Sequence, residues 1–544
     1  MDSQQKLFGV LSIPLVWLAT FALACVWIFK LQKTVRGVNL AAASFGQKPY
    51  TILSYSREYV RGILDFPGLL SENYARSNGE KPFVVPNPMF GPIVMVTAKH
   101  VSEYRFARDT ELNAQEALHK ILQTKWTLPD KTWDSGPSFH PTHLRKYLQK
   151  SIGPSTPDLA TEINLAMSRF WNVESSNGDW IEVDLLGSLL KIVTQGINKL
   201  YIGEEIGRDE GYIDGLVALA TAVVTCGLTL NLVPLPFKSI ASTLMCWPTR
   251  YRRQVLIDRY LCDVIQRRKL KLEGNTAERE TEDSESYTDY CMALLSAAYK
   301  DPNPAYYETE NFMSRFMTHY IAAIFTTSVT FSGVVEKLIQ HPHMLSVLRD
   351  EANAVLIDPE NPHTWRKTDI AHLDIHDSFI RESMRTTPVS FAVMRRSAIK
   401  PEGYTFPDGT VIPSYFEVGV PLDQLHHDEK YYKDARQFDP LRFTAKSKPT
   451  DESFADRSGT NGSNTRKAPL TTTTPSFLVW GDGSHACIGR FLAANILKIT
   501  LANLVLNYDI EPATNFSSQR RSFGVMNVPN RTSRIRIRQR VRKL

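Results

Sequence analysis

The chain has 544 residues, of which 43% are hydrophobic and 22% are charged. This composition is typical of a folded globular protein and excludes a mainly disordered chain or a multi-span transporter. The six cysteines are scattered and form no Cys-x-x-Cys pair, so the sequence indicates neither a disulfide scaffold nor a zinc module. The net charge of +6 is carried by seven basic residues between Arg531 and Leu544, and we find no nucleic-acid recognition motif. We therefore predict no nucleic-acid partner.

The N-terminal segment contains an uncharged run of 22 residues, Phe8 to Phe29. About 20 apolar residues span a bilayer. Three basic residues follow within 30–36, and basic residues stay on the cytoplasmic side. A cleaved signal peptide is the alternative, but the apolar run continues beyond its candidate cleavage site at 22–24. We predict an uncleaved single-pass transmembrane anchor over residues 1–36 and a body, residues 37–544, that faces the cytosol.

A second uncharged run extends from Leu216 to Phe237 and is long enough to cross a bilayer. Glycine, asparagine and two prolines interrupt this run. We therefore expect a buried or membrane-dipping helix with an exit broken by proline, rather than a second span.

Strand patterns in the body are short. Apolar runs between Pro82 and Val96 predict a hairpin, and strand and turn residues recur from Tyr404 to Val420. The tail after Arg531 alternates Arg with Ile or Val, which predicts a terminal strand with one solvated face. Contact of this tail with an anionic membrane or a partner is the alternative.

Helical patterns dominate the rest. The pattern from about 112 to 356 is mostly helical, with one long helix after Asn303-Pro304 that reaches about Gln340, and another helix is predicted from Phe491 to about Asn507. Residues 446–475 are rich in Ser, Thr, Gly and Asn and predict a flexible insert. The predicted fold class is mainly α with small β-sheets (α+β), in one domain behind the anchor.

One cysteine, Cys487, lies in a glycine-rich stretch. The stretch reads Trp480-Gly481-Asp482-Gly483-Ser484-His485-Ala486-Cys487-Ile488-Gly489-Arg490. Glycines allow a tight turn, and main-chain N–H groups with the start of a helix just after Cys487 would lower the pKa of its thiol. A thiolate held in a nest of amides is what a haem iron needs as its axial ligand. A buried, inert cysteine beside a tight turn is the alternative.

This stretch resembles the haem-binding signature of the cytochrome P450 family. The resemblance implies the fold of that family and haem b as the cofactor, with Cys487 as the axial iron ligand. Its other expected haem-binding residues in this stretch are Trp480, Gly481, Gly483, His485 and Gly489. The family usually has Phe at the position of Trp480, and this aromatic exchange could tune the redox potential.

Two further segments match the family upstream of the cysteine. Glu382-Ser-Met-Arg385 is similar to its Glu-x-x-Arg motif, whose spacing places both side chains on one helix face, and Arg442 lies in a segment similar to Pro-x-Arg-Phe. The resemblance implies a buried structural network of Glu382, Arg385 and Arg442 behind the haem loop. A surface ion pair is the alternative for Glu-x-x-Arg taken alone.

The middle of the long helix reads Ala322-Ala323-Ile324-Phe325-Thr326-Thr327-Ser328 and resembles the oxygen-activation motif of the family. The resemblance implies catalytic roles for Thr326, which orients oxygen and its protons, and for Thr327. It also implies that Ala322, Ala323 and Phe325 line the substrate pocket. Phe325 departs from the pattern because an acid is usual there, which puts the type of oxygen chemistry in doubt.

Two arginines are candidates for the haem propionates. Arg395 follows Arg385 by ten residues, a spacing used for this purpose in the family, and we expect either Arg395 or the adjacent Arg396 to lie on the surface instead. Arg145 is the second candidate, in a weakened form of the family's Trp-x-x-x-Arg helix, with a solvated arginine as the alternative. The nearby residues expected in the substrate pocket are Val389, Phe391 and Val393.

The resemblance to ascomycete members implies a membrane-anchored monooxygenase that oxidises a lipophilic small molecule, a terpenoid or related secondary metabolite. It implies O2 as co-substrate, electrons from an NADPH-cytochrome P450 reductase, and residence in the endoplasmic reticulum membrane with the catalytic body in the cytosol. A haem-thiolate isomerase or dehydratase that needs no reductase is one alternative, and a non-catalytic haem-binding sensor is another.

Overall fold

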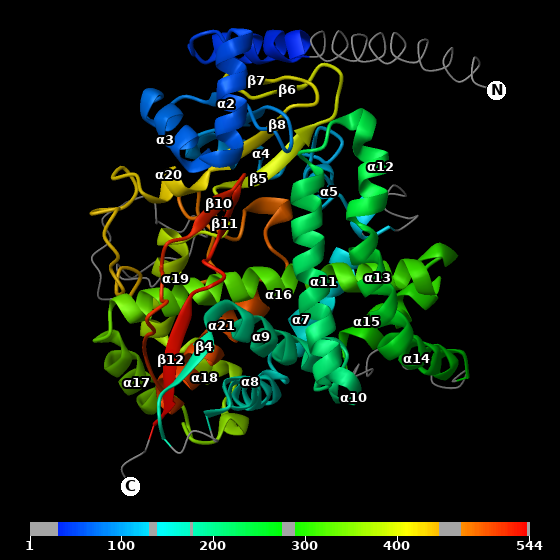
Figure 1. The fold of residues 1–544 in the computed structure, drawn as a ribbon, viewed down its shortest axis with the longest axis vertical. Coiled ribbons are helices and arrows are strands. Elements are labelled where there is room, and N and C mark those ends of the chain that lie inside the picture. The colour runs from blue at the N-terminus through cyan, green and yellow to red at the C-terminus, as the bar shows by residue number, and fades with distance from the viewer. Residues whose placement is uncertain (1–30, 130–138, 174–177, 275–288, 445–468, 541–544) are drawn as a thin grey trace, which may run out of the picture.

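The computed structural model describes residues 31–129, 139–173, 178–274, 289–444 and 469–540 (Figure 1). The predicted membrane span at 8–29 lies outside them, as does most of the predicted insert at 446–475. The described part of the chain is mainly helical with small sheets, as the sequence predicted.

Residues 31–44 are helical. The helices that follow are α2 (Ile52–Leu64), α3 (Phe66–Arg76), α4 (Ala98–Tyr104), α5 (Ala114–Leu122), α6 (Thr124–Thr127), α7 (Phe139–Ser151), α8 (Thr156–Trp171), α9 (Leu185–Tyr201), α10 (Glu204–Gly207), α11 (Glu210–Leu230), α12 (Leu235–Met245), α13 (Trp247–Leu256), α14 (Cys262–Gly274), α15 (Tyr290–Lys300), α16 (Thr309–Gln340), α17 (Met344–Val355), α18 (Lys367–Ala371), α19 (Asp374–Thr386), α20 (Leu422–His426) and α21 (Arg490–Asn507).

The strands are β1 (Phe83–Val85), β2 (Ile93–Met95), β3 (Leu112–Asn113), β4 (Ile181–Asp184), β5 (Ala392–Ala398), β6 (Tyr404–Thr405), β7 (Val411–Ile412), β8 (Glu417–Pro421), β9 (Tyr508–Pro512), β10 (Arg521–Phe523), β11 (Met526–Val528) and β12 (Arg534–Gln539). They form a five-stranded sheet of order β1-β2-β8-β5-β3, a three-stranded sheet β4-β12-β9, and the pairs β10-β11 and β6-β7.

Several predicted elements are confirmed. The hairpin is the antiparallel pair β1-β2, with Phe83 opposite Met95. The C-terminal alternation forms β12, which buries Ile535 and Ile537 between β4 and β9 and leaves its arginines on the other face. The long predicted helix is α16, which ends just before His341-Pro342 because proline cannot continue it.

The helix α16 runs through the middle of the body (Figure 1). It packs against α9, α11, α19 and α21, and its buried apolar side chains belong to the largest hydrophobic cluster. Of the described helices, α11 and α16 are long and apolar enough to cross a membrane, but α16 is largely buried inside the protein and α11 is half buried. The second uncharged run therefore forms a packed helix, α11, which ends at Leu230 before the prolines begin.

Candidate active site

The stretch around Cys487 folds into a tight loop before α21. The main-chain N–H of Cys487 donates to the carbonyl of Trp480 at 2.7 Å, and that of Gly481 donates to Leu478 at 2.9 Å. The indole Nε1 of Trp480 donates to the carbonyl of Leu470 at 2.8 Å. Trp480 therefore ties the loop to residues just before it, a bond that the phenylalanine usual in the family would not make.

A second contact holds the loop against the end of α4. The main-chain N–H of Ser484 donates to the carbonyl of Arg105 at 3.1 Å, and Nη1 of Arg105 lies 3.2 Å from Oδ2 of Asp482. Gly483 has a φ of +70°, and a Cβ at this position would lie 2.1 Å from the same Arg105 carbonyl oxygen. The close approach of loop and α4 therefore requires glycine at 483.

We expect Gly483→Ala to lower the free energy of unfolding by about 2 kcal/mol or more, because it adds left-handed strain to a backbone clash. Gly274→Ala is the matched control, since Gly274 ends α14, far in sequence from the loop, without a positive φ and with open space where a Cβ would point. Urea unfolding of both variants, together with their haem content, checks this expectation. Equal losses in the two variants would contradict it.

The surface of the Cys487 side chain is accessible to solvent. Many protein atoms nevertheless surround the sulfur, and this desolvation raises the pKa of the thiol. The accessible surface therefore faces a space inside the protein. The N–H of Gly489 and the charge and N–H of Arg490 act in the opposite direction. The expected net lowering of the Cys487 pKa is therefore wrong for the protein alone. The helix begins at Arg490, three residues further on, and its amides do not outweigh desolvation.

One face of α16 is accessible in the middle of an otherwise buried helix. Ala322 and Thr326 are exposed and lie one turn apart, and Oγ1 of Thr326 donates to the carbonyl of Ala322 at 2.7 Å. This is the bond to the i−4 carbonyl that a helical threonine favours. The exposure of both side chains indicates free space beside this turn.

The other residues of the motif point elsewhere. Phe325 is 5% exposed and belongs to the main hydrophobic core, and Thr327 is also 5% exposed. Ala323 is half-buried and packs against the same core. The expectation that Phe325 lines the pocket is therefore not supported by the packing, whereas Ala322 and Thr326 share the accessible face.

The structure brings Glu382, Arg385 and Arg442 together. Glu382 and Arg385 are fully buried and form two parallel hydrogen bonds of 2.7 Å, and Nε of Arg442 donates to the same carboxylate at 3.1 Å. Nη1 of Arg385 also donates to the carbonyl of Ala435 at 2.7 Å. The network thus fastens α19 to the segment that precedes the cysteine loop.

His485 lies among charged groups. Its Nε2 is 2.8 Å from Oδ1 of Asp109. Burial lowers the pKa of His485, Asp109 opposes this shift, and the positive charges of Arg396 and Arg145 lower the pKa further. Two arginines therefore lie within electrostatic range of the loop.

A pocket of about 320 Å³ adjoins the loop where it enters α21. Arg145 is exposed and lines it from α7, and Arg490 lines it from the start of α21. The other lining residues are Leu148, Gln149, Ile152, Lys367, Ile488 and Phe491. The structure therefore places Arg145 beside the loop, and its role toward a haem propionate stays a prediction.

Arg395 has only part of its guanidinium engaged, because its Nη1 is buried without a hydrogen-bond partner among the described residues. Arg395 forms a buried ion pair with Glu417 and stacks on the ring of Phe90, 3.8 Å from its centroid. Arg396 donates to the carbonyls of Tyr104 and Arg105 at 2.8 and 2.9 Å. The expectation that one of the two lies on the surface is wrong, because Arg395 is 7% exposed and Arg396 is 1% exposed.

The three residues expected in the pocket after α19 diverge. Val389 is half-buried against the main core, whereas Phe391 is buried in the cluster that contains Phe66 and Met89. Val393, in β5 of the five-stranded sheet, packs half-buried against a third cluster. Residues spaced by two share one face of a regular strand, but β5 begins only at Ala392, and the irregular chain before it carries these side chains into different clusters.

Sequence reasoning missed three supports of the loop. Arg381 stacks on Phe477 at 3.7 Å from its centroid and donates to the carbonyls of Pro469 and Thr472. His426 stacks on Phe477, and its Nδ1 lies 3.0 Å from the Arg385 carbonyl; burial lowers its pKa far below the usual value. Asp109 pairs with His485. Only the position of Arg381 beside Glu382 offered a signal.

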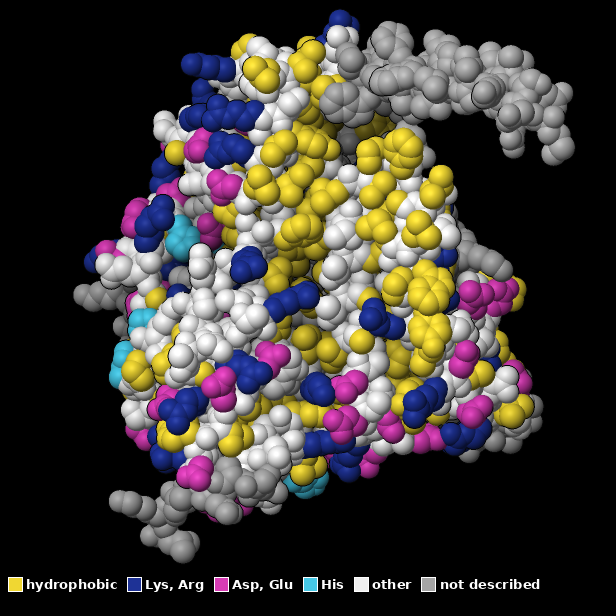
Figure 2. Space-filling view, in the orientation of Figure 1, with side chains coloured by type: hydrophobic (Ala, Val, Ile, Leu, Met, Phe, Trp, Pro, Cys, Tyr) yellow, Lys and Arg dark blue, Asp and Glu magenta, His cyan; other side chains and the backbone are white. Residues whose placement is uncertain are grey.

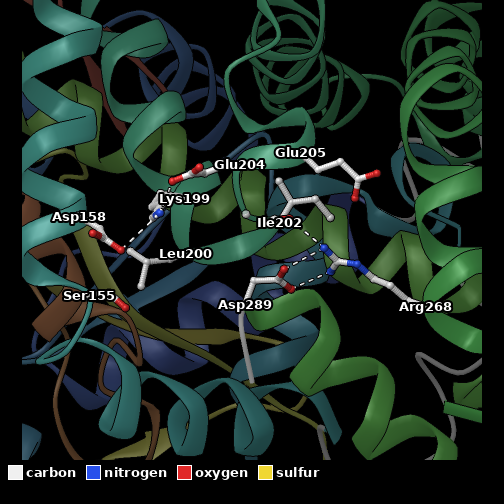
Figure 3. Close-up of a pocket in the computed structure, with 10 residues that line it drawn as sticks. Ser155, Asp158, Lys199, Leu200, Ile202, Glu204, Glu205, Arg268 and Asp289 are labelled. Carbon is white, nitrogen blue, oxygen red and sulfur yellow. Dashed lines mark hydrogen bonds and ion pairs between the residues drawn. The ribbon is translucent and has the colours of Figure 1, made fainter. Parts of the chain in front are cut away.

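A separate polar pocket of about 280 Å³ lies near the C-terminal end of α9 (Figure 3). Arg268 forms two hydrogen bonds with Asp289, at 2.7 and 2.8 Å, and Lys199 bridges Asp158 and Glu204. Its cations are therefore neutralised within the pocket, and none of the candidate residues above is among those that line it.

The residues present fit a haem. Cys487 offers an accessible sulfur donor, the backbone at Gly489 leaves open space, and Thr326 lies on an accessible face of α16. Cys487 would hold the iron, and Arg145 and the unpartnered Nη1 of Arg395 are the groups that would face the propionates.

A model of the cytochrome P450 family matches residues 144–534. Cytochrome P450 monooxygenase 151 of Postia placenta is 28% identical over 458 residues, which cover 83% of this chain and 84% of the relative. Cytochrome P450 monooxygenase avaL of Aspergillus versicolor is 28% identical over 482 residues, 84% of this chain and 81% of the relative. Cytochrome P450 monooxygenase okaG of Penicillium ochrochloron is 26% identical over 457 residues, 81% of this chain and 82% of the relative.

The chain therefore belongs to the cytochrome P450 family. It is a cytochrome P450 monooxygenase, with fungal relatives and with the haem cofactor and cysteine thiolate iron ligand of that family.

Proposed function

We propose that this enzyme is a membrane-anchored monooxygenase that oxidises a lipophilic small molecule, a terpenoid or related fungal secondary metabolite. The observation that carries the proposal is that the Cys487 thiol and one turn of α16, Ala322 to Thr326, are both accessible in an otherwise buried core. The substrate class rests on the resemblance of both motifs to ascomycete members. In this proposal, residues 37–544 form the haem-thiolate catalytic domain, and residues 446–475 form a flexible insert within it.

Each side chain has a defined task in this proposal. When bound, haem supplies the activation of dioxygen, and the Cys487 thiolate donates electron density to its iron. Thr326 holds a hydroxyl proton on the accessible face of α16 and positions it for transfer. Buried Phe325 keeps water out of the helix at the place where the family has a carboxylate.

The proposed membrane contact has support in the body. Exposed apolar side chains of α2 include Leu53 and Leu64, and those of α12 include Ile240 and Leu244. Both helices lie in the upper half of Figure 1, at the end where residues 31–44 are found, and hydrophobic side chains gather there in Figure 2. Such an apolar surface suits a bilayer next to the anchor at 1–36, in the endoplasmic reticulum membrane.

Electrons come, in this proposal, from an NADPH-cytochrome P450 reductase that docks on the Cys487 side. Three cationic residues, Arg145, Lys367 and Arg490, line the pocket beside the loop. A cationic surface steers an anionic partner toward it.

The proposal is tested by supplying the haem-loaded full chain with NADPH, a diflavin reductase, isotopically labelled dioxygen and candidate terpenoids. NADPH-dependent products that carry the label are expected. Conversion of substrate without reductase would instead establish the isomerase or dehydratase that Phe325 favours, and ligand binding without any conversion would overturn the enzymatic proposal.

We expect Thr326→Ala to keep the haem but to lower the product formed per NADPH by about tenfold or more, because a positioned proton donor is lost. Thr318→Ala is the matched control, since Oγ1 of Thr318 makes the same i−4 bond, to Ser314 at 2.8 Å, two turns earlier in α16. Product and peroxide are measured together. Unchanged coupling in Thr326→Ala would show that Thr326 does not carry the proton.

A further inference from the structure

Two cysteines from separate helices meet in the interior. The Sγ atoms of Cys226 in α11 and Cys246 at the end of α12 lie 2.6 Å apart, and both side chains are buried. They share a small apolar cluster with Leu230. Nothing in the haem chemistry uses this pair, which is remote in sequence from Cys487.

The α11 side of the pair is held rigidly. At Gly227 a Cβ would lie 2.7 Å from the carbonyl oxygen of Leu122, so α11 crosses the end of α5 at backbone contact. Nδ2 of Asn231, just after α11, donates to the carbonyl of Lys120 at 2.7 Å. These contacts fix the position of Cys226 relative to α5.

The α12 side has far less support. Three apolar side chains of this short helix point outward, with Phe237 at 52%, Ile240 at 68% and Leu244 at 73% exposure. Cys246 caps the C-terminal end of α12 and begins α13, and it is itself fully buried. The contact between the two sulfur atoms thus links α12 directly to α11, beside the packing of Ala241 and the bond from Arg250 to the Ser242 carbonyl at 2.9 Å.

The surroundings favour a reactive thiol. The hydrogen bond from Cys246 lowers the pKa of Cys226, against the opposing effect of burial, and the Thr249 hydroxyl and the charge of Arg250 act in the same lowering direction. Thiolate is the attacking form in thiol–disulfide exchange.

We propose that Cys226 and Cys246 form a reversible disulfide that clamps α12 to α11. A low-molecular-weight disulfide such as oxidised glutathione is the oxidant. The Cys226 thiolate attacks it and releases one glutathione thiolate, and Cys246 then attacks the mixed disulfide and releases the second. The two protein thiols lose two electrons and two protons, and the oxidant becomes two molecules of glutathione. In a reducing compartment such a bond is transient, which suits a switch rather than a permanent crosslink.

The bond would restrict the apolar surface of α12. It closes a loop from 226 to 246 that contains the whole helix, so α12 could no longer swing away from α11. Oxidation would thereby hold the exposed face of α12 in one orientation relative to the body.

The test uses the haem-loaded full chain, incubated with either oxidised glutathione or dithiothreitol. Peptide mass mapping is expected to find a Cys226–Cys246 disulfide after oxidation and two free thiols after reduction. Proteolysis within 227–245 is expected to slow by about tenfold or more in the oxidised form, because the crosslink opposes local opening. The haem spectrum reports that Cys487 stays bound in both forms.

Cys226→Ser and Cys246→Ser should each abolish the redox effect on proteolysis, and Cys262→Ser, at a half-buried cysteine in α14, should leave it intact. Two independent serine variants keep the test usable if one fails to fold. Absence of the crosslinked peptide would overturn the pairing. A crosslink that leaves proteolysis of 227–245 unchanged would overturn the clamp.

Discussion

Cys487→Ser is expected to abolish the red-shifted carbonyl spectrum of the reduced enzyme and to reduce turnover below detection. A serine hydroxyl remains protonated near neutral pH, so it cannot replace the thiolate donor. The loop itself should fold, because its ties to Trp480 and Arg105 use main-chain atoms at 487 and 484. The spectrum of the reduced, carbon monoxide-treated protein and its far-ultraviolet circular dichroism are measured side by side.

Cys291→Ser is the matched control for this experiment. Cys291 is buried in α15, and burial raises the pKa of its thiol to about 12, so it remains protonated and serves packing. Its replacement should preserve the carbonyl spectrum. If Cys487→Ser retained the same spectrum as the parent, another residue would have to hold the iron.

The elements that follow from local pattern were predictable. The start of α16 followed from the helical pattern after Asn303-Pro304, and its end from the proline at 342. Both signals act locally, because they depend on helix propensity and on the geometry of proline. The glycines at 481 and 483 predicted a tight loop, and both adopt positive φ angles in the structure. The spacing of Glu382 and Arg385 placed them on one helix face, since this depends only on helix geometry.

The surroundings of Arg395 were not predictable because they depend on strand register. The pairing of β5 with β8 shifts between Val393 and Arg396, and Met394 within this irregularity has a φ of 54°. A shift by one residue reverses the direction of a side chain. Arg395 thus meets Glu417, twenty-two residues away, while Arg396 turns toward α4 and the cysteine loop. Counting ten residues from Arg385 carries no information about such a shift.

The direction of the Cys487 pKa shift was unpredictable for a related reason. The sequence shows which amides are near in the chain but not how many atoms of other elements surround the sulfur. Burial is a sum over the whole fold, and it outweighs the local amides. Bonding of the thiolate to a metal cation would compensate the buried charge.

Glu382→Gln is expected to lower the free energy of unfolding by about 3 kcal/mol, because it leaves the fully buried Arg385 and the partly buried Arg442 without their common carboxylate. The glutamine amide matches the carboxylate in size, so packing is preserved and the lost charge is isolated. Nη2 of Arg385 and Nε of Arg442 both donate to Oε1 of Glu382, as does the main-chain N–H of Asp439. An amide oxygen could accept some of these bonds, but its NH2 group would face a guanidinium donor.

Glu72→Gln provides the control, since Glu72 pairs with Arg61 at 2.7 Å in the same geometry but on the surface. Solvent screens that pair, so its loss should change stability little. Urea midpoints and haem content are measured for both variants. Similarly small losses of stability in both variants would contradict the prediction. The carbonyls of Ala435 and His426 would then be enough to stabilise the Arg385 charge. Other contacts, such as those of Arg381, would hold the segment before the cysteine loop.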